Sequence, residues 1–290
     1  MSLITSCLLS FSALLLGGMG ALAAGHAGGL AFGLEGMMVA GGLAGLLCSH
    51  LSAAVSLLIA GAAGAAYALL LGLAVRKKGD SYFAGVAVNA LAAALAMAVA
   101  KLIGGVSYSR KTYQLLMNDE NITVFLPVAL GLFLVLWLAL FHTRWGLRLR
   151  LCGENGEAAR KRGVRLEGMR CLGWLICGFM AGIGGQAAFI ALGSGWRWEW
   201  GVGGMGMLAL AAVALGRWRA WGVLLSAALL SLARVGADAA AAAGWHVPDG
   251  LLQMVPFLLA LIVLAAVGAR DKAPGEIGRQ MKRIRFPEEE

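Results

Sequence analysis

Ionisable side chains interrupt two otherwise apolar stretches of this sequence, and Glu35 is the first of them. Glu35 stands at the start of the apolar run Gly36–Leu47, with Gly33 and Gly36 beside it. A carboxylate at membrane depth is costly unless it meets a partner or a watery cavity, and helices broken at glycine can present backbone groups to a substrate. Glu35 and Gly36 are therefore candidates to line a translocation pathway. The alternative is that Glu35 lies at the membrane interface and is hydrated there.

Arg234 and Asp238 form the second interruption, within the apolar segment Trp221–Ala243. Their spacing of four residues places them on one face of a helix. We interpret them as an ion pair that neutralises both charges inside a helical bundle, and a role in gating is the alternative. In a transporter driven by H⁺ or Na⁺, Glu35 or Asp238 would be the coupling carboxylate.

A second short apolar run, Met205–Leu215, leads into Arg217 and Trp218 and is flanked by glycine like the first. The pair of short runs predicts two structural repeats, each with a broken helix. Arg217 and Trp218 are candidate pathway residues, although such an arginine is more typical of an anchor at the membrane interface. Asn89, near the start of another apolar run, either caps its helix or lines the pathway, and capping is the favoured interpretation.

The usual signatures of catalysis and metal binding are absent from the sequence. The five Cys residues form no CxxC pair, and the four His residues are scattered. No GxxxxGK[ST] run occurs, so the chain has no conventional cradle for ATP phosphates. No Ser-His-Asp set and no carboxylate pair stands out, which disfavours an intramembrane enzyme. We expect no metal site and no cofactor in this chain.

A polar island, Arg144–Arg170, separates two long apolar regions. It holds eight Lys or Arg residues and three Glu residues. Asn155 is placed to cap a short helix over Glu154–Arg162, whose first turn is acidic and whose last turn is basic, and Gly163 supplies a left-handed stop. A short, charged, well-capped helix on a membrane protein is suited to docking a partner in the cytoplasm.

The composition is that of an integral membrane protein. Of the 290 residues, 60% are hydrophobic and only 13% are charged, and the mean hydropathy is +0.80. A water-soluble domain of this size could not bury so much apolar surface. The 43 Gly residues suit helices that approach one another closely in lipid.

The apolar runs predict an all-α, polytopic transmembrane helical bundle of about 8–10 spans, with nine favoured. A retained first helix is preferred to a cleaved signal peptide, because no Lys or Arg precedes it. We expect residues 1–269 to form this domain, including the cytoplasmic loop 144–170, and residues 270–290 to form a basic and acidic cytoplasmic tail. The predicted spans are Leu3–Leu22, Gly36–Leu47, Leu51–Val75, Phe83–Ala100, Val124–Phe141, Leu172–Leu192, Met205–Leu215, Trp221–Ala243 and Leu251–Ala266.

The basic residues are concentrated in three segments. Arg76–Lys78, Arg144–Arg170 and the tail from Arg270 hold 17 of the 24 Lys and Arg residues. The positive-inside rule places all three in the cytoplasm. The net charge of +9 is therefore explained by topology in a membrane, and nucleic-acid binding is not indicated. Membrane lipid is the expected surrounding.

Four motifs occur along the chain: Gly33–Met38 (GLEGMM), Tyr82–Asn89, Gly146–Arg150 with Gly153–Asn155 and Glu157–Ala159, and Ala211–Trp218 (AAVALGRW). In this order they resemble segments of bacterial ABC-transporter permeases of the branched-chain amino acid and simple-sugar superfamily. The resemblance is closest to the nucleoside or simple-sugar branch and covers most of the chain. One departure is Ala31, where the family commonly carries Asn, so a substrate contact from that Asn would be lost here.

The resemblance implies the permease subunit of an ABC importer, which moves a small polar solute of the nucleoside or simple-sugar class inward. ATP and Mg would be held by a separate ATP-binding cassette subunit. The further partners would be a second permease chain, either a paralogue or an identical copy, and an extracytoplasmic solute-binding protein, at the bacterial inner membrane. An ion-coupled secondary transporter is the alternative.

The resemblance also implies that the polar island carries the coupling helix that the ATPase subunit grips. Ala158 and Ala159 are expected at the contact because their side chains are short, and Glu154 and Arg160 at its rim. A loop that only sets orientation in the membrane is the alternative. The implied coupling residues are Gly153, Glu154, Asn155, Glu157, Ala158, Ala159 and Arg160.

Overall fold

The chain folds into helices joined by turns, and no strand occurs in the part that the structure, a computed structural model, describes. That part comprises residues 3–48, 51–76, 81–103, 119–192, 201–242, 249–267 and 273–277. The all-α architecture predicted from the sequence is confirmed. The helices are α1 (Leu3–His26), α2 (Leu34–Leu47), α3 (Ala53–Arg76), α4 (Ser81–Ile103), α6 (Asp119–His142), α7 (Arg144–Glu154), α8 (Gly156–Lys161), α9 (Leu166–Leu192), α10 (Met205–Leu215), α11 (Ala220–Ala242) and α12 (Asp249–Val267).

Six helices are long and apolar enough to cross a membrane: α1, α3, α4, α6, α9 and α11. Three shorter apolar helices accompany them, namely α2, α10 and the segment Leu251–Ala266 of α12. Within the described residues, each apolar run predicted from the sequence therefore forms a helix, apart from Leu51 and Ser52 before α3. The polytopic helical bundle is confirmed, and the short apolar helices α2 and α10 lie where broken helices are predicted.

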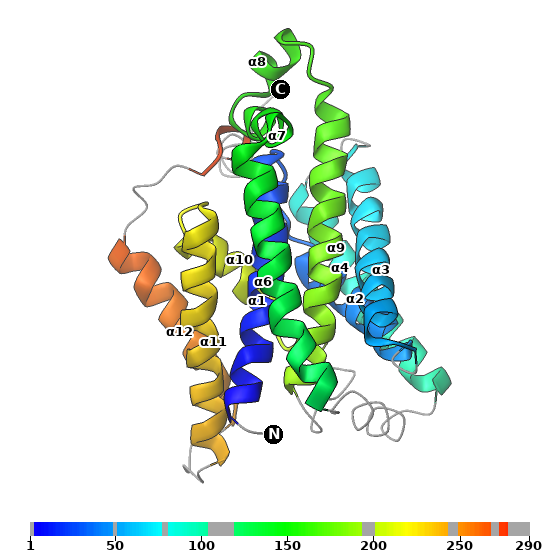
Figure 1. The fold of residues 1–290 in the computed structure, drawn as a ribbon, viewed down its shortest axis with the longest axis vertical. Coiled ribbons are helices and arrows are strands. Elements are labelled where there is room, and N and C mark those ends of the chain that lie inside the picture. The colour runs from blue at the N-terminus through cyan, green and yellow to red at the C-terminus, as the bar shows by residue number, and fades with distance from the viewer. Residues whose placement is uncertain are drawn as a thin grey trace.

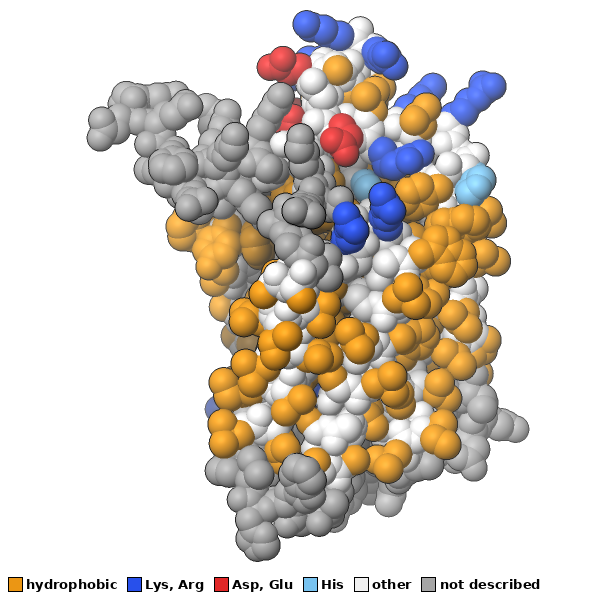
Figure 2. All heavy atoms as spheres, turned by 90° about the vertical axis from the view of Figure 1, so that its left-hand side faces the viewer, with side chains coloured by type: hydrophobic (Ala, Val, Ile, Leu, Met, Phe, Trp, Pro, Cys, Tyr) orange, Lys and Arg blue, Asp and Glu red, His pale blue; other side chains and the backbone are white. Residues whose placement is uncertain are grey.

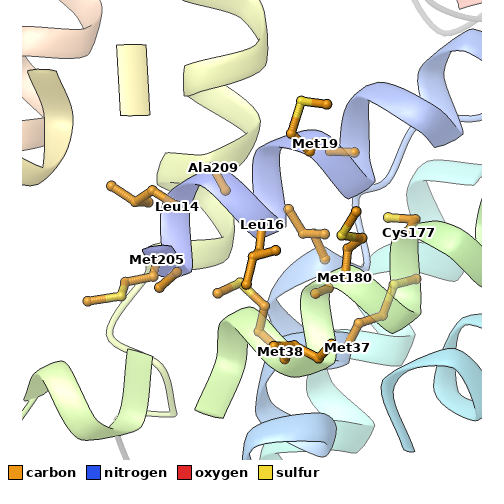
Figure 3. Packing of buried hydrophobic residues seen from close by; sticks show 14 of the residues in the cluster. Leu14, Leu16, Met19, Met37, Met38, Cys177, Met180, Met205 and Ala209 are labelled. Atoms are coloured by element: carbon orange, nitrogen blue, oxygen red, sulfur yellow. The ribbon is translucent and has the colours of Figure 1, made fainter. Parts of the chain in front are cut away.

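Helices α1 and α9 form the centre of the bundle. In their most apolar windows, 83% of α1 and 72% of α9 lie inside the protein, against 22% of α4. Small residues allow these helices to approach, since an added Cβ at Gly20 would lie 2.8 Å from the Cys177 carbonyl oxygen. Figure 3 shows Leu16, Met38 and Met180 converging from α1, α2 and α9 on one apolar core. The outer helices leave apolar faces for lipid.

The short charged helices lie at one end of the bundle. Figure 1 shows α7 and α8 at the top, next to the start of α9, while the N-terminus lies toward the bottom. Helix α3 runs antiparallel to α9, because Gly64 contacts Gly178 and Ala60 contacts Gly182, so α3 ends toward the α8 end. Figure 2 shows Lys and Arg side chains gathered at that end above a broad hydrophobic belt. Of the basic segments, Lys77, Lys78, residues 270–272 and residues 278–290 lie outside the described part.

Candidate functional site

The break between α1 and α2 is held by a side chain of α4. Helix α2 begins after Gly33 without a side-chain cap of its own. The Gly36 N–H donates to Oδ1 of Asn89 (2.7 Å), and Nδ2 of Asn89 donates to the Phe32 carbonyl (2.8 Å). Because α4 begins at Ser81, the prediction that Asn89 caps its own helix is wrong. Asn89 instead supplies, from another helix, the cap that α2 lacks.

Glu35 plays the same part for α10. Its Oε1 accepts a hydrogen bond from the Gly204 N–H (3.0 Å), and its Oε2 accepts from the N–H groups of Gly206 (2.7 Å) and Met207 (3.3 Å). These amides belong to the N-terminal turn of α10, where a helix has unpaired donors and a partial positive charge. The carboxylate is thus bound to the second half of the chain. The alternative of a carboxylate hydrated at the membrane interface is not what the structure shows.

The N-terminal ends of α2 and α10 touch. A Cβ added at Gly206 would lie 2.6 Å from the Glu35 Cα, so only glycine lets the two backbones meet at this distance. Arg234 of α11 closes the cluster, because its Nη1 donates to the Gly203 carbonyl (3.1 Å). Arg234 also lies within electrostatic range of Asp238, as the spacing predicts, and of Glu35.

The C-terminal end of α10 is tied to α1. Arg217 and Trp218 both adopt φ of 56°, a left-handed conformation that is uncommon for residues other than glycine. The Trp218 ring packs on the backbone of Gly25, and the His26 side chain hydrogen-bonds the Trp218 backbone. The Arg217 side chain is exposed at this turn. Both ends of α10 therefore contact the α1–α2 segment, the N-terminal end through Glu35 and the C-terminal end through Trp218.

The charged island folds into two capped helices, α7 and α8. The Thr143 hydroxyl caps α7 by accepting from the Gly146 N–H (3.1 Å), and Oδ1 of Asn155 caps α8 by accepting from the Ala158 N–H (3.1 Å). Helix α8 ends in a left-handed Gly163 (φ 76°), as the sequence predicts. The helix itself is shorter than predicted, since it spans Gly156–Lys161.

The faces of α8 differ from the prediction. Gly153 and Glu154 belong to the last turn of α7, and Asn155 alone separates the two helices. Ala159 is fully buried, so its predicted place at a docking contact is wrong. Ala158 is partly exposed. The outward side chains at this end of the molecule are mainly charged or polar: Glu154, Asn155, Glu157, Arg160, Lys161 and Arg162.

Helix α7 is seated directly on the end of α1. Gly153 has no room for a side chain, because an added Cβ would overlap the His26 carbonyl oxygen and would lie 3.0 Å from that of Gly25. The Arg150 guanidinium stacks over the Phe141 ring at 4.9 Å from its centroid, and the His26 ring meets that of Phe141 edge to face. The last turns of α1, α6 and α7 thus form one packed block, which we call the α1 hub. Through Gly25 and His26 this hub joins α7 to α2 and to α10.

Three contributors to this arrangement are not predicted from the sequence: His26, Arg234 as a donor to the Gly203 carbonyl, and the amides of Gly204, Gly206 and Met207. A sequence signal existed for the last, in the glycine-rich run GVGGMG that precedes α10. The polar His26 at the end of an apolar span was a weaker signal. No group of three or more His, Cys, Asp or Glu side chains suited to a metal occurs in the described ranges.

A helical bundle with spanning-length apolar helices, two short inner helices that meet at their N-terminal ends, and a capped charged element at one end defines a multi-pass membrane transport subunit. The sequence profile of the family described as "Branched-chain amino acid transport system / permease component" matches residues 3–266, and the chain belongs to this family. It is a permease subunit of an ABC transporter.

The chain is similar to two permease proteins of nucleoside ABC transporters. It is 30% identical to the guanosine ABC transporter permease protein NupQ of Bacillus subtilis (strain 168), in an alignment 306 positions long that covers 94% of each protein. It is 31% identical over 165 residues to the nucleoside ABC transporter permease protein NupC of Lactococcus lactis subsp. cremoris (strain MG1363). That match covers 56% of this chain and 50% of NupC. The resemblance stated from the motifs is confirmed.

Proposed function

We propose that this chain is the permease of a bacterial ABC importer for nucleosides, in which α7 and α8 pass the work of an ATPase subunit to α2 and α10. The observation that carries the proposal is the seating of Gly153 on the carbonyl groups of Gly25 and His26. It makes the charged end of the molecule continuous with both short helices. A chain without its own nucleotide-binding motif must receive work mechanically, and this contact supplies a rigid route.

The nucleoside class is supported by the printed names of the two relatives, one for guanosine and one for nucleosides. The interior chemistry agrees with an uncharged polar solute. The Glu35 charge is compensated by three backbone amides and by nearby Arg234, so the cluster is not built to bind an ion. Ala31, where the family commonly has Asn, is buried.

In this proposal the pathway is framed where α2 meets α10, by Glu35, Gly36 and Asn89. Their contacts join the break in the first half to the start of α10 in the second half. A shift of the α1 hub would reach the contact between α2 and α10 by two routes. One runs through the α1–α2 break, which Asn89 holds. The other runs through α10, because Trp218 at its C-terminal end packs on Gly25. In this proposal Arg217 and Trp218 transmit movement of the α1 hub to α10 and do not contact the solute.

The proposed assembly contains an ATP-binding cassette subunit, which holds ATP and Mg, on the α7–α8 side. A second permease chain, either a paralogue or a copy of this one, completes the pathway, and a solute-binding protein delivers nucleoside at the opposite face. The bacterial inner membrane is the proposed location. The exposed apolar faces of α4 and α12 would meet lipid or the second permease.

The test is reconstitution of the chain with its ATPase subunit and solute-binding protein in liposomes, with uptake of radiolabelled guanosine, uridine and ribose followed. We expect ATP-dependent uptake of the nucleosides, competed by unlabelled nucleoside and not by ribose. Uptake by the chain without an ATPase subunit, driven by a proton or sodium gradient, would replace the proposal with the ion-coupled alternative. ATP-dependent uptake of ribose alone would overturn the nucleoside assignment.

A further inference from the structure

The chain returns to the coupling helices near its C-terminal end. Residues 273–277 pack at the junction of α7 and α8, with Pro274 and Ile277 buried. Gly275 lies against the Glu154 carbonyl at the end of α7, and Gly28 of the α1–α2 break faces the Glu276 Cβ. We call residues 273–277 the C-terminal strap. The strap packs against the helices of the domain. The boundary predicted at residue 270 would instead place it in a separate tail.

Glu276 is the polar centre of the strap. Its Oε1 accepts a hydrogen bond from the Gly156 N–H (3.2 Å), and its Oε2 accepts from Nη2 of Arg170 in α9 (3.4 Å). The Glu276 side chain is 17% exposed and that of Arg170 is 38% exposed. Since the carboxylate faces inward, it bridges two elements of this chain and is not an outward docking group.

The position of Gly156 explains why this bridge matters. Asn155, with φ −150° and ψ 98°, is the single extended residue between α7 and α8. A single-residue junction lets α8 pivot on α7 unless something fixes it. The Asn155 side chain takes one free N–H of the first turn of α8, that of Ala158, and Glu276 takes another, that of Gly156.

We propose that Glu276 is a positioning residue for energy coupling: it fixes the start of α8 to α9 and to the α1–α2 break, so that force on the outer face of α8 moves the α1 hub. This inference rests on the proposed function. Without the bridge, α8 would turn about Asn155 when the ATPase subunit moves, and hydrolysis would proceed with little transport. The strap supplies from the far end of the chain a contact that α7 and α8 cannot make themselves.

The test compares Glu276→Ala with Glu276→Gln in the reconstituted permease–ATPase complex, with radiolabelled guanosine as the solute. The measured quantity is guanosine imported per ATP hydrolysed. A residue needed only for folding would lower the amount of complex and leave this ratio unchanged. The glutamine retains an oxygen that can accept from the Gly156 N–H but lacks the charge, so it separates the cap from the ion pair with Arg170.

We expect Glu276→Ala to co-purify with the ATPase subunit, to hydrolyse ATP and to lose about tenfold in guanosine imported per ATP, as the loss of a partly buried hydrogen bond to a charged group predicts. Glu276→Gln should lose part of this ratio, because its single acceptor oxygen can serve the Gly156 N–H or Arg170 but cannot bridge the two. A wild-type ratio in Glu276→Ala would overturn the inference. If wild-type protein itself shows no ATP-dependent uptake, the proposed function fails instead.

Discussion

Glu35 is a charge whose surroundings are set by α10. The sequence marks it as costly, because it stands beside an apolar run of helix length. The sequence cannot identify the groups that bind the Glu35 carboxylate, since these are backbone amides at least 169 residues further along the chain. Backbone amides have no sequence signature. Asn89 is a similar case: its residue type predicts capping, but the helix that it caps is α2.

Glu35→Gln should lower ATP-dependent guanosine uptake about tenfold, because the charge-assisted cap of α10 is lost. The NH₂ group of the glutamine is a donor and cannot accept from the backbone N–H groups of α10. Insertion and co-purification with the ATPase subunit should persist, since removal of a buried charge does not oppose insertion. Uptake in reconstituted vesicles is the measurement.

Asp238→Asn is the matched control for Glu35→Gln. Asp238 is exposed. In this variant Arg234 keeps its hydrogen bond to the Gly203 carbonyl and its place near Glu35, so uptake should stay near the wild-type rate. The reverse outcome, with Asp238→Asn inactive and Glu35→Gln active, would favour Asp238 as the coupling carboxylate of an ion-driven transporter.

At the scale of the elements, the sequence predicts which segments are helical and how the helices are capped better than it predicts which helix face is buried. Each apolar run becomes a helix because its length and composition leave no other structure in lipid. The caps of α8 follow from residue types at fixed offsets, Asn155 before the helix and Gly163 after it. Which face of α8 is buried could not be predicted, because Gly156–Lys161 is too short to show a helical period and its inner side is set by remote contacts.

Gly153→Ala tests the seat of α7 on α1. A methyl group there overlaps the His26 carbonyl oxygen, so α7 must shift away from the α1 hub, at a cost of about 1–3 kcal/mol typical of overpacking. We expect the variant to insert and to bind the ATPase subunit. Guanosine uptake per ATP should fall and the unfolding temperature should drop.

Gly168→Ala is the control for this change. Gly168 lies in the first turns of α9, where an added Cβ meets nothing within 4 Å, and alanine favours a helix more than glycine does. This variant should transport like the wild type. Equal transport by Gly153→Ala and Gly168→Ala would show that force does not pass through the α7–α1 seat.

At the scale of the whole molecule, the sequence predicts an asymmetric charge distribution, and Figure 2 shows it as Lys and Arg side chains gathered at one end. The positive-inside rule uses composition alone, so it needs no knowledge of packing. The C-terminal strap could not be predicted in this way. Five residues without periodicity carry no local signal, and their place depends on a surface that the α1–α2 break, α7, α8 and α9 build together.

The orientation of the whole bundle is open to a direct test with two single-cysteine variants, Lys161→Cys on α8 and Leu3→Cys at the opposite end. Both positions are exposed. The background would lack the native thiols, which are Cys7, Cys48, Cys152, Cys171 and Cys177. Because α8 must meet an ATPase in the cytoplasm, an impermeant maleimide should label Lys161→Cys only in inside-out vesicles and Leu3→Cys only in right-side-out vesicles. Labelling of Lys161→Cys in right-side-out vesicles would place α8 outside the cell, where no ATPase subunit could drive it.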